Sequence, residues 1–291
     1  MKGENLTEMF DLSQAGALSF SNGDFSISNT KLLLKALQYS SQLGQPIFQN
    51  PRDIDLSSGS QMHEGIISTS LGLKGEPSLS EEITIARDLD ILEYAGGNLH
   101  FSMVSTAKGL GLIRKAKKSG LKVTCDVSIL HLLFTDQSIG EFDSNFKSLP
   151  PFRTEKDRKS LIKGILDGTV DAICSGHRPQ DTDSKKLEFD FAEPGSITLQ
   201  TFYSCLNTIS ENVPFEVLID KVSNGPREIL GLEKISISEG TTSKLTVLEP
   251  ESSWIFDHQS NKSKSSNSPF WNDSMKGKVF ATINRGQVSI N

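Results

Sequence analysis

The residues best suited to chemistry follow a short apolar run at positions 172–174, in a loop that carries His177 and Arg178. The run has the composition of a buried strand, and a β/α barrel places its reactive groups at the carboxyl ends of its strands. A metal-dependent hydrolase needs a carboxylate here to take a proton from metal-bound water, with histidines nearby. The residue before His177 is Gly176, which has no side-chain atom that could accept a proton. The loop therefore indicates the scaffold of an enzyme without a general base at this position.

The elements that would position this loop alternate between strand and helix patterns. Strand patterns cover residues 17–20, 46–49, 98–104, 121–127 and 170–175, and helix patterns cover residues 31–43, 80–95, 107–119, 158–166, 198–209 and 215–230. This alternation predicts an α/β protein with a parallel sheet, and the regular repeat favours a β/α barrel over an open sheet. Only five such strands can be placed, whereas a closed barrel needs eight.

The texture of the sequence changes at about residue 236. Strand patterns at residues 244–248, 278–283 and 287–290, with a turn at Arg285-Gly286, predict a small antiparallel β unit. Residues 257–268 are rich in Ser, Asn and Lys, which is typical of a solvated loop. We therefore expect a barrel portion at residues 1–235 and a C-terminal β unit at residues 236–291.

Composition excludes several classes of protein. The net charge of −6, without a basic patch, argues against binding to nucleic acid. No apolar stretch approaches the roughly 18 residues of a membrane span, and no apolar signal core follows the first residues. Cys125, Cys174 and Cys205 have no metal-ligand spacing, which predicts buried free thiols in a reducing compartment. We expect a cytoplasmic protein that binds neither nucleic acid nor membrane.

The sequence resembles the metal-dependent dihydroorotases, in the cyclic amidohydrolase branch of the amidohydrolase superfamily. Ordered matches run along the whole chain, among them residues 8–20, 63–65, 104–106, 131–136, 145–147, 150–153, 167–173, 223–232, 263–270 and 276–279. The resemblance implies an eight-stranded TIM-type barrel with a β-sandwich built from both chain ends. This chain would then hold about the last five β/α units and part of the sandwich. An incomplete or degenerate reading frame is the expected reason for the missing strands.

The resemblance also implies where a zinc site would lie and what replaces it. The acidic ligand of the family aligns with Asn22 and Gly23, and its next histidine ligand aligns with Asn50. A further histidine ligand aligns with Met103, and the catalytic aspartate aligns with Gly176. Active members use zinc, whereas these replacements predict that this chain binds no metal or other cofactor and has no catalytic residue.

Four side chains remain as candidates for a residual pocket: His177, His131, Arg153 and Arg52. His177 is interpreted first as a loop histidine, and the two arginines as solvated or salt-bridged structural residues. His100 is expected in the core, because it alternates to the other face of its strand. His63 and His258 are expected at the surface.

Because metal ligands, base and substrate contacts are lost together, the resemblance predicts a dihydroorotase-like protein of pyrimidine biosynthesis without activity. Inactive members of this family can hold aspartate carbamoyltransferase in a larger assembly, so that enzyme or a second copy of this chain is the expected partner. The alternative is an active metal-dependent cyclic amidohydrolase that opens dihydroorotate, hydantoin or a related ring. Its rebuilt site would take ligands from Asp24, Asp53, Asp126, His131 or His177. A third possibility is a decayed fragment without function.

Overall fold

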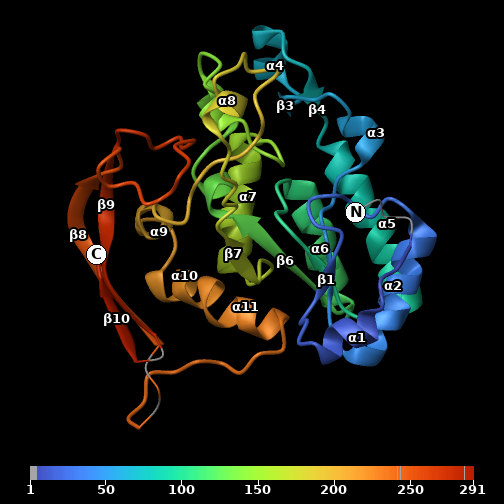
Figure 1. The fold of residues 1–291 in the computed structure, drawn as a ribbon. Helices are drawn as coiled ribbons and strands as arrows, with labels where there is room; N and C mark the ends of the chain where they lie inside the picture. Colours follow the sequence, from blue (N-terminus) through green and yellow to red (C-terminus); the bar gives the residue numbers. More distant parts are fainter. Residues whose placement is uncertain (1–4, 241, 243, 285) are drawn as a thin grey trace.

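A computed structural model describes residues 5–240, 242, 244–284 and 286–291 (Figure 1). Its centre is a parallel sheet of five strands in the order β1-β2-β5-β6-β7. The strands are β1 (Phe20–Ser21), β2 (Ile47–Gln49), β5 (Leu99–Phe101), β6 (Val123–Ser128) and β7 (Ala172–Cys174). Each coincides with one of the five predicted strand segments, and the predicted partial β/α barrel is confirmed.

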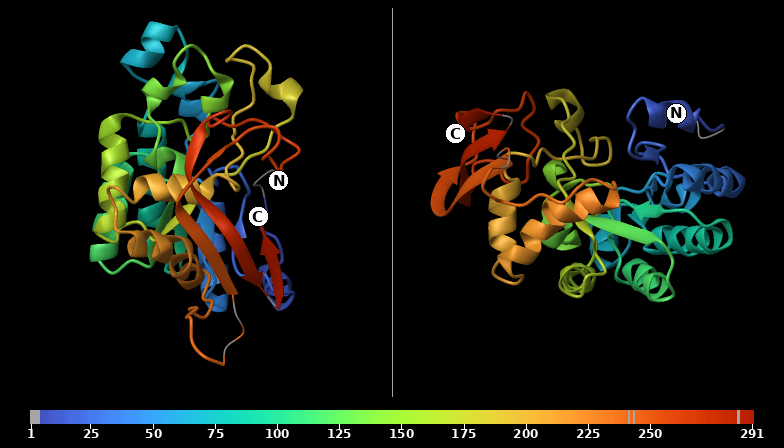
Figure 2. Two further views of the ribbon diagram at one scale, coloured as in Figure 1. Left: turned by 90° about the vertical axis from the view of Figure 1, so that its left-hand side faces the viewer. Right: turned by 90° about the horizontal axis from the view of Figure 1, so that it is seen from below.

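Four long helices cover one face of this sheet (Figures 1 and 2). They are α2 (Thr30–Leu43), α5 (Leu79–Ala95), α6 (Ala107–Lys118) and α7 (Glu155–Leu166), and each contacts the next along the row. Their apolar stripes meet the sheet through fully buried side chains such as Leu37, Ile85 and Ile113. Thr154 accepts a hydrogen bond from the amide of Asp157 and so completes the predicted capping box of α7. The core fixes the sheet, and the loops at the carboxyl edge are built on it.

The predicted helix at residues 215–230 is two helices, α10 (Phe215–Val222) and α11 (Asn224–Ile229). Pro226 has no backbone N–H to donate to the preceding turn, so an uninterrupted helix is disfavoured and the proline lies in the first turn of α11. The other helices are α1 (Met9–Gln14), α3 (Ile54–Ser57), α4 (Ile66–Leu71), α8 (Thr182–Lys185) and α9 (Phe202–Ile209). Short 3₁₀ helices lie at η1 (Ile129–Leu132), η2 (Asp136–Ile139) and η3 (Ser144–Phe146).

A small unit between β2 and α5 escaped prediction. Strands β3 (Met62–His63) and β4 (Gly75–Glu76) pair in parallel on either side of α4. Met62 packs there with Ile139 and Phe189 in a separate hydrophobic cluster. The expectation that His63 lies at the surface is wrong, because its side chain is buried beside Arg153. Strands of two residues are too short for an alternating pattern to show.

The C-terminal unit is an antiparallel sheet in the order β10-β9-β8, as predicted. Its strands are β8 (Lys244–Ile255), β9 (Ser274–Asn284) and β10 (Gln287–Ile290), and the sheet packs on α9 (Figures 1 and 2). Strand β8 continues beyond the predicted segment because its pairing with β9 resumes at Ser253, after an irregularity that contains Pro250. Arg285 of the predicted turn lies outside the described residues, and the boundary between residues 235 and 236 stays a prediction.

The three cysteines are free thiols, as predicted. Burial raises the pKa of Cys205 to about 12 and shifts the pKa of Cys125 and Cys174 in the same direction. Such thiols are poor nucleophiles and poor metal ligands at neutral pH. Across the described part of the chain, no helix is both long and apolar enough to cross a membrane.

Close packing at Gly225 yields a test of the fold. A β-carbon at this position would lie 2.1 Å from the carbonyl oxygen of Asp171, which belongs to the backbone just before β7. Gly225→Ala should therefore lower the free energy of unfolding by about 3 kcal/mol, measured by urea denaturation. Gly111→Ala is the matched control, because a β-carbon there meets nothing within 4 Å in the middle of α6. That change should raise stability by about 0.5–1 kcal/mol, and equal midpoints for the two variants would contradict this packing.

Candidate functional site

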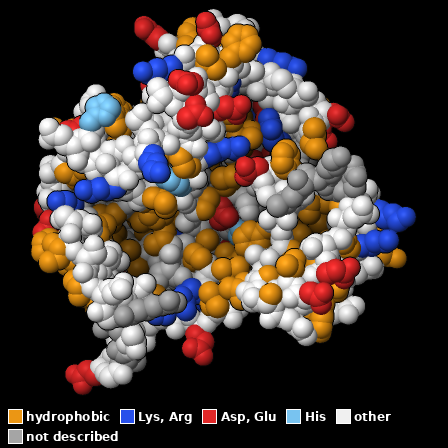
Figure 3. All heavy atoms as spheres, in the orientation of Figure 1, with side chains coloured by type: hydrophobic (Ala, Val, Ile, Leu, Met, Phe, Trp, Pro, Cys, Tyr) orange, Lys and Arg blue, Asp and Glu red, His pale blue; other side chains and the backbone are white. Residues whose placement is uncertain are grey.

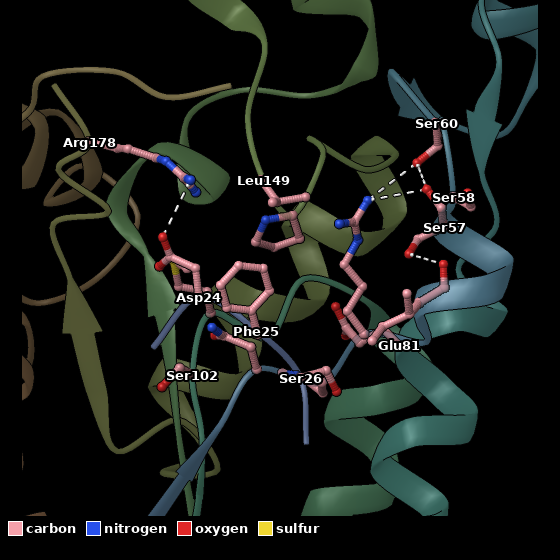
Figure 4. A pocket seen from close by; sticks show the side chains of 17 residues that line it. Asp24, Phe25, Ser26, Ser57, Ser58, Ser60, Glu81, Ser102, Leu149 and Arg178 are labelled. Carbon is pink, nitrogen blue, oxygen red and sulfur yellow. Dashed lines mark hydrogen bonds and ion pairs between the residues drawn. The ribbon is translucent and has the colours of Figure 1, made fainter. Parts of the chain in front are cut away.

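A cavity of about 330 Å³ opens at the carboxyl ends of β1, β2 and β5 (Figure 4). Segments that are far apart in the sequence form its walls, because parallel strands bring the loops that follow them to one edge of the sheet. These segments are Asp24–Ser26 after β1, Asn50–Arg52 after β2, Ser102–Met103 after β5, Leu149–Pro150, Ser57–Ser60 and Arg178. Figure 3 shows this face of the molecule hollowed near its centre, with acidic and basic side chains interspersed above the hollow. The cavity has the position expected of a barrel's active site.

Two of the four degenerate metal-site positions line this cavity, namely Asn50 and Met103. The side-chain amide of Asn50 donates to the carbonyl oxygen of Gly23 at 2.9 Å, which ties the loops after β1 and β2 together. Asn22 instead borders a different cavity beside α1 and α2. The predicted positions are therefore neighbours in part, but they present an amide and a thioether where the family has imidazoles.

The backbone at Met103 is in the left-handed region, with φ of 54°. A residue with a β-carbon adopts this conformation at some cost, so other contacts must hold it there. The Met103 amide donates to Oδ1 of Asp126 at 2.8 Å, and Oδ2 of the same carboxylate lies 2.9 Å from Nε2 of His100. His100 is buried in the core, as predicted. Asp126 therefore fixes the loop after β5 and is fully used in doing so.

Gly176, at the position of the catalytic aspartate, is also left-handed, with φ of 59°. A β-carbon built here would lie 2.6 Å from Oγ of Ser128, which caps η1 by accepting from the Leu130 amide. The space next to this backbone is therefore already occupied by a side chain with a structural function. A carboxylate at residue 176 would need both a strained backbone and a displaced Ser128.

Of the four residual pocket candidates, only Arg52 lines the cavity. Its guanidinium pairs with Glu76 at 2.7 Å, and Arg153 pairs with the other carboxylate oxygen of Glu76 at 3.1 Å. Arg153 also donates to the Ser105 hydroxyl and is buried. Both arginines are thus engaged by groups of the protein itself.

The expectation that His131 and His177 belong to the same residual pocket is wrong. His131 is buried in η1 against the ring of Phe152, with its Nε2 3.1 Å from the carbonyl oxygen of Pro150. Burial, together with the nearby Arg153 charge, lowers the pKa of His131 to about 4. His177 accepts hydrogen bonds at Nδ1 from the backbone amides of residues 198 and 199 and lines a separate cavity. The two rings are held by different loops, and neither faces the cavity at β1, β2 and β5.

The side chains that an alternative metal site would require are also separately engaged. Asp24 forms an ion pair with Arg178 at 3.3 Å, and Asp53 caps α3 by accepting from the Leu56 amide. Over the described ranges, no three His, Cys, Asp or Glu side chains come together as a group that could hold a metal ion. The residues present at the cavity do not fit zinc, which prefers three or four N, S or O ligands in a tetrahedral arrangement.

Glu81 is a cavity residue that the sequence reasoning missed. Its buried carboxylate accepts hydrogen bonds from the backbone and the hydroxyl of both Ser105 and Thr106. Burial raises the pKa of Glu81, while these donors and Arg153 oppose that shift. The predicted apolar stripe of this helix ran through Ile83, which is 40% exposed. The buried stripe starts at Glu81 and continues through Ile85, so a charged residue at an apolar position was the available signal.

The comparisons with known proteins agree with this geometry. A family model described as dihydro-orotase-like matches residues 1–109. The dihydroorotases of Syntrophus aciditrophicus and Geobacter metallireducens are each 36% identical to this chain over 289 residues, covering 99% of it and 68% of the relative. Among solved structures, the L-hydantoinase of Arthrobacter aurescens superposes with a TM-score of 0.83 at 20% identity, covering 98% of this chain and 67% of that one. A D-hydantoinase from Bacillus sp. AR9 gives a TM-score of 0.84 at 16% identity, covering 99% and 69%.

The structural matches assign the fold to the β/α-barrel class of the hydantoinases, with the cavity at the carboxyl ends of the strands. Within that class, the sequence relatives are more specific, since they exceed a third identity over almost the whole chain. The chain belongs to the dihydroorotase family.

Replacing His131 should change how folding responds to acid. Its pKa is about 4 in the folded chain and 6.5 as the model value, so between these values the unfolded chain binds a proton that the folded chain does not. Stability from the neutral ring is full above the higher value and is lost as the pH falls toward the lower one, by about 3 kcal/mol in total. Urea unfolding at neutral pH and near the lower value should therefore show a smaller acid-induced loss for His131→Gln than for the unchanged chain.

His258→Gln is the control for this measurement, because His258 is exposed beside Trp271. That variant should lose as much stability in acid as the unchanged chain. If His131→Gln behaves in the same way, the buried neutral state assigned to His131 is wrong.

Proposed function

We propose that this chain is a dihydroorotase-family protein that does not hydrolyse dihydroorotate and acts in pyrimidine biosynthesis as a structural partner of aspartate carbamoyltransferase. The single observation that carries the loss of activity is at Gly176. The family's catalytic aspartate aligns with this residue, which has no proton acceptor, and Ser128 Oγ lies 2.6 Å from where a β-carbon would be. The backbone has adjusted around the missing side chain.

Other groups at the cavity support the same proposal. Opening a cyclic amide needs a water made nucleophilic by a metal and a base that takes its proton. Asn50 and Met103 line the cavity in place of two imidazole ligands, and Asn50 is bonded to Gly23. Removing a base alone typically lowers a rate by ~10² to 10⁴. Loss of both functions together leaves no route to ring opening from the described side chains.

The proposal predicts that the purified full-length chain retains no zinc and opens no ring. Metal content measured by mass spectrometry should equal that of a chelator-treated sample, because the cavity lacks the ligand set. Hydrolysis of dihydroorotate, followed with and without added zinc or manganese, should not exceed the rate in buffer. Stoichiometric zinc together with ring opening that a chelator abolishes would overturn the proposal and favour an active amidohydrolase.

Gly176→Asp provides a structural control for this assay. The left-handed backbone should cost a residue with a β-carbon about 1–2 kcal/mol, and Ser128 must also move. We expect this variant to be less stable and still inactive, and expect Gly176→Asp with Ser128→Gly to recover part of the stability. Activity from Gly176→Asp alone would mean that the metal site is intact.

The partnership is supported by the family resemblance and by apolar side chains left exposed at two places. Phe191 and Leu199 are 72% and 65% exposed in the loops beside α9, and Val288 and Ile290 of β10 are 63% and 70% exposed. Apolar groups gathered on a surface are typical of interaction sites.

Purification of the native protein from its source cells, followed by mass spectrometry of the bound chains, tests the partnership. Aspartate carbamoyltransferase should co-purify and should be lost when Val288→Lys and Ile290→Lys are combined. Glu249→Lys on the neighbouring β8 strand is the matched control for an added positive charge. Recovery as an isolated monomer would contradict the partnership, and recovery of a homo-oligomer would show self-association instead.

A further inference from the structure

The cavity at the carboxyl ends of β1, β2 and β5 has a polar group that the fold leaves unused. Ser26 lines this cavity and is only 8% exposed, and its hydroxyl has no hydrogen-bond partner among the described residues. A buried hydroxyl without a partner costs about 1–3 kcal/mol, so such groups are rare where nothing else binds them. Figure 4 shows Ser26 on the same side of the cavity as Glu81 and below Phe25.

The charges around the cavity are already balanced by groups of the protein. Arg178 pairs with Asp24, and Arg52 pairs with Glu76. The Glu81 carboxylate lies in the wall and is neutralised by donors from Ser105 and Thr106. An anionic ligand would have to displace one of these carboxylates or lie beside Glu81 without a free cation. The balance of charge therefore favours an uncharged ligand.

The remaining walls are mainly apolar and suit a flat ring. Phe25, Met103, Leu149 and Pro150 border the space, and Figure 4 shows the Phe25 ring close to Leu149. A volume of about 330 Å³ is at the lower end of the range for small-molecule sites, which combine apolar walls with a few polar groups. One ring with one polar substituent fills such a space.

We propose that this cavity binds a small uncharged planar ring carrying an amide, which hydrogen-bonds to the Ser26 hydroxyl, and that it rejects the corresponding carboxylate. A hydroxyl both donates and accepts, so it can pair with either end of an amide. The inference rests on the proposed function, because a cavity without metal or base binds its ligand without converting it.

The test uses a matched pair of probes, nicotinamide and nicotinate, which differ in charge and hardly in shape. Binding to the full-length chain is measured by ligand-observed NMR with a chelator present, so that the result does not depend on metal. Nicotinamide should bind saturably, and nicotinate should bind at least about tenfold more weakly, since it carries a charge without a free partner. Equal binding of the two probes, or no binding of nicotinamide to folded protein, would overturn the proposal.

Ser26→Ala tests the proposed hydrogen bond. The substitution leaves no protein group without a partner, because the hydroxyl has none, so the fold should tolerate it. The affinity for nicotinamide should fall about fivefold, as expected for one neutral hydrogen bond. Ser160→Ala is the matched control, because that hydroxyl bonds only to Lys156 on the exposed face of α7, and its affinity should not change.

Ile54→Trp gives a second, independent test, because Ile54 is 52% exposed at the rim of the cavity. The larger side chain should fill the space and abolish nicotinamide binding without disturbing the core. Unchanged affinity in both Ser26→Ala and Ile54→Trp would place the ligand elsewhere and contradict the proposal. The absence of metal and of hydrolysis would still stand in that case, so the two proposals fail separately.

Discussion

The carboxylate of Glu76 lies between two guanidinium groups, and the carboxyl edge of the sheet is organised around it. Arg52 reaches it from the loop after β2, and Arg153 reaches it from the segment before α7. Arg153 also donates to Ser105, whose hydroxyl donates in turn to Glu81 at the start of α5. Four separate segments are held by this one network. Removal of one partner from such a buried pair typically costs 3–5 kcal/mol, because the other charge is left uncompensated.

This network explains why the cavity keeps its shape without any metal to organise it. Asn50 is bonded to Gly23, the amide of Met103 is bonded to Asp126, and Ser128 packs against Gly176. Each position aligned with a family ligand or base has a contact made by the protein alone. The loops are therefore set by internal hydrogen bonds and ion pairs, and the chemistry of the side chains could change while the framework stayed in place.

Much of the fold could be predicted from the sequence, because long apolar runs ending in glycine mark the five parallel strands and their helices. The sequence could not predict β3 and β4, since two residues show no period, or the break at Pro226 between α10 and α11. For the site, the positions of Asn50 and Met103 at one cavity followed from the order of the strands. The orientation of His131 did not, because the 3₁₀ turn of η1 decides which way its ring points. Glu81 was overlooked because its partners come from a loop more than twenty residues away.

The two left-handed residues at the carboxyl edge differ in how easily their history could be reversed. At Met103 the unusual backbone is already occupied by a residue with a β-carbon, so exchanging one side chain for another leaves the main chain as it is. At Gly176 the neighbouring hydroxyl has taken the vacated volume, so a return requires two coordinated exchanges. The first of these losses is a substitution, whereas the second has been locked in by its surroundings.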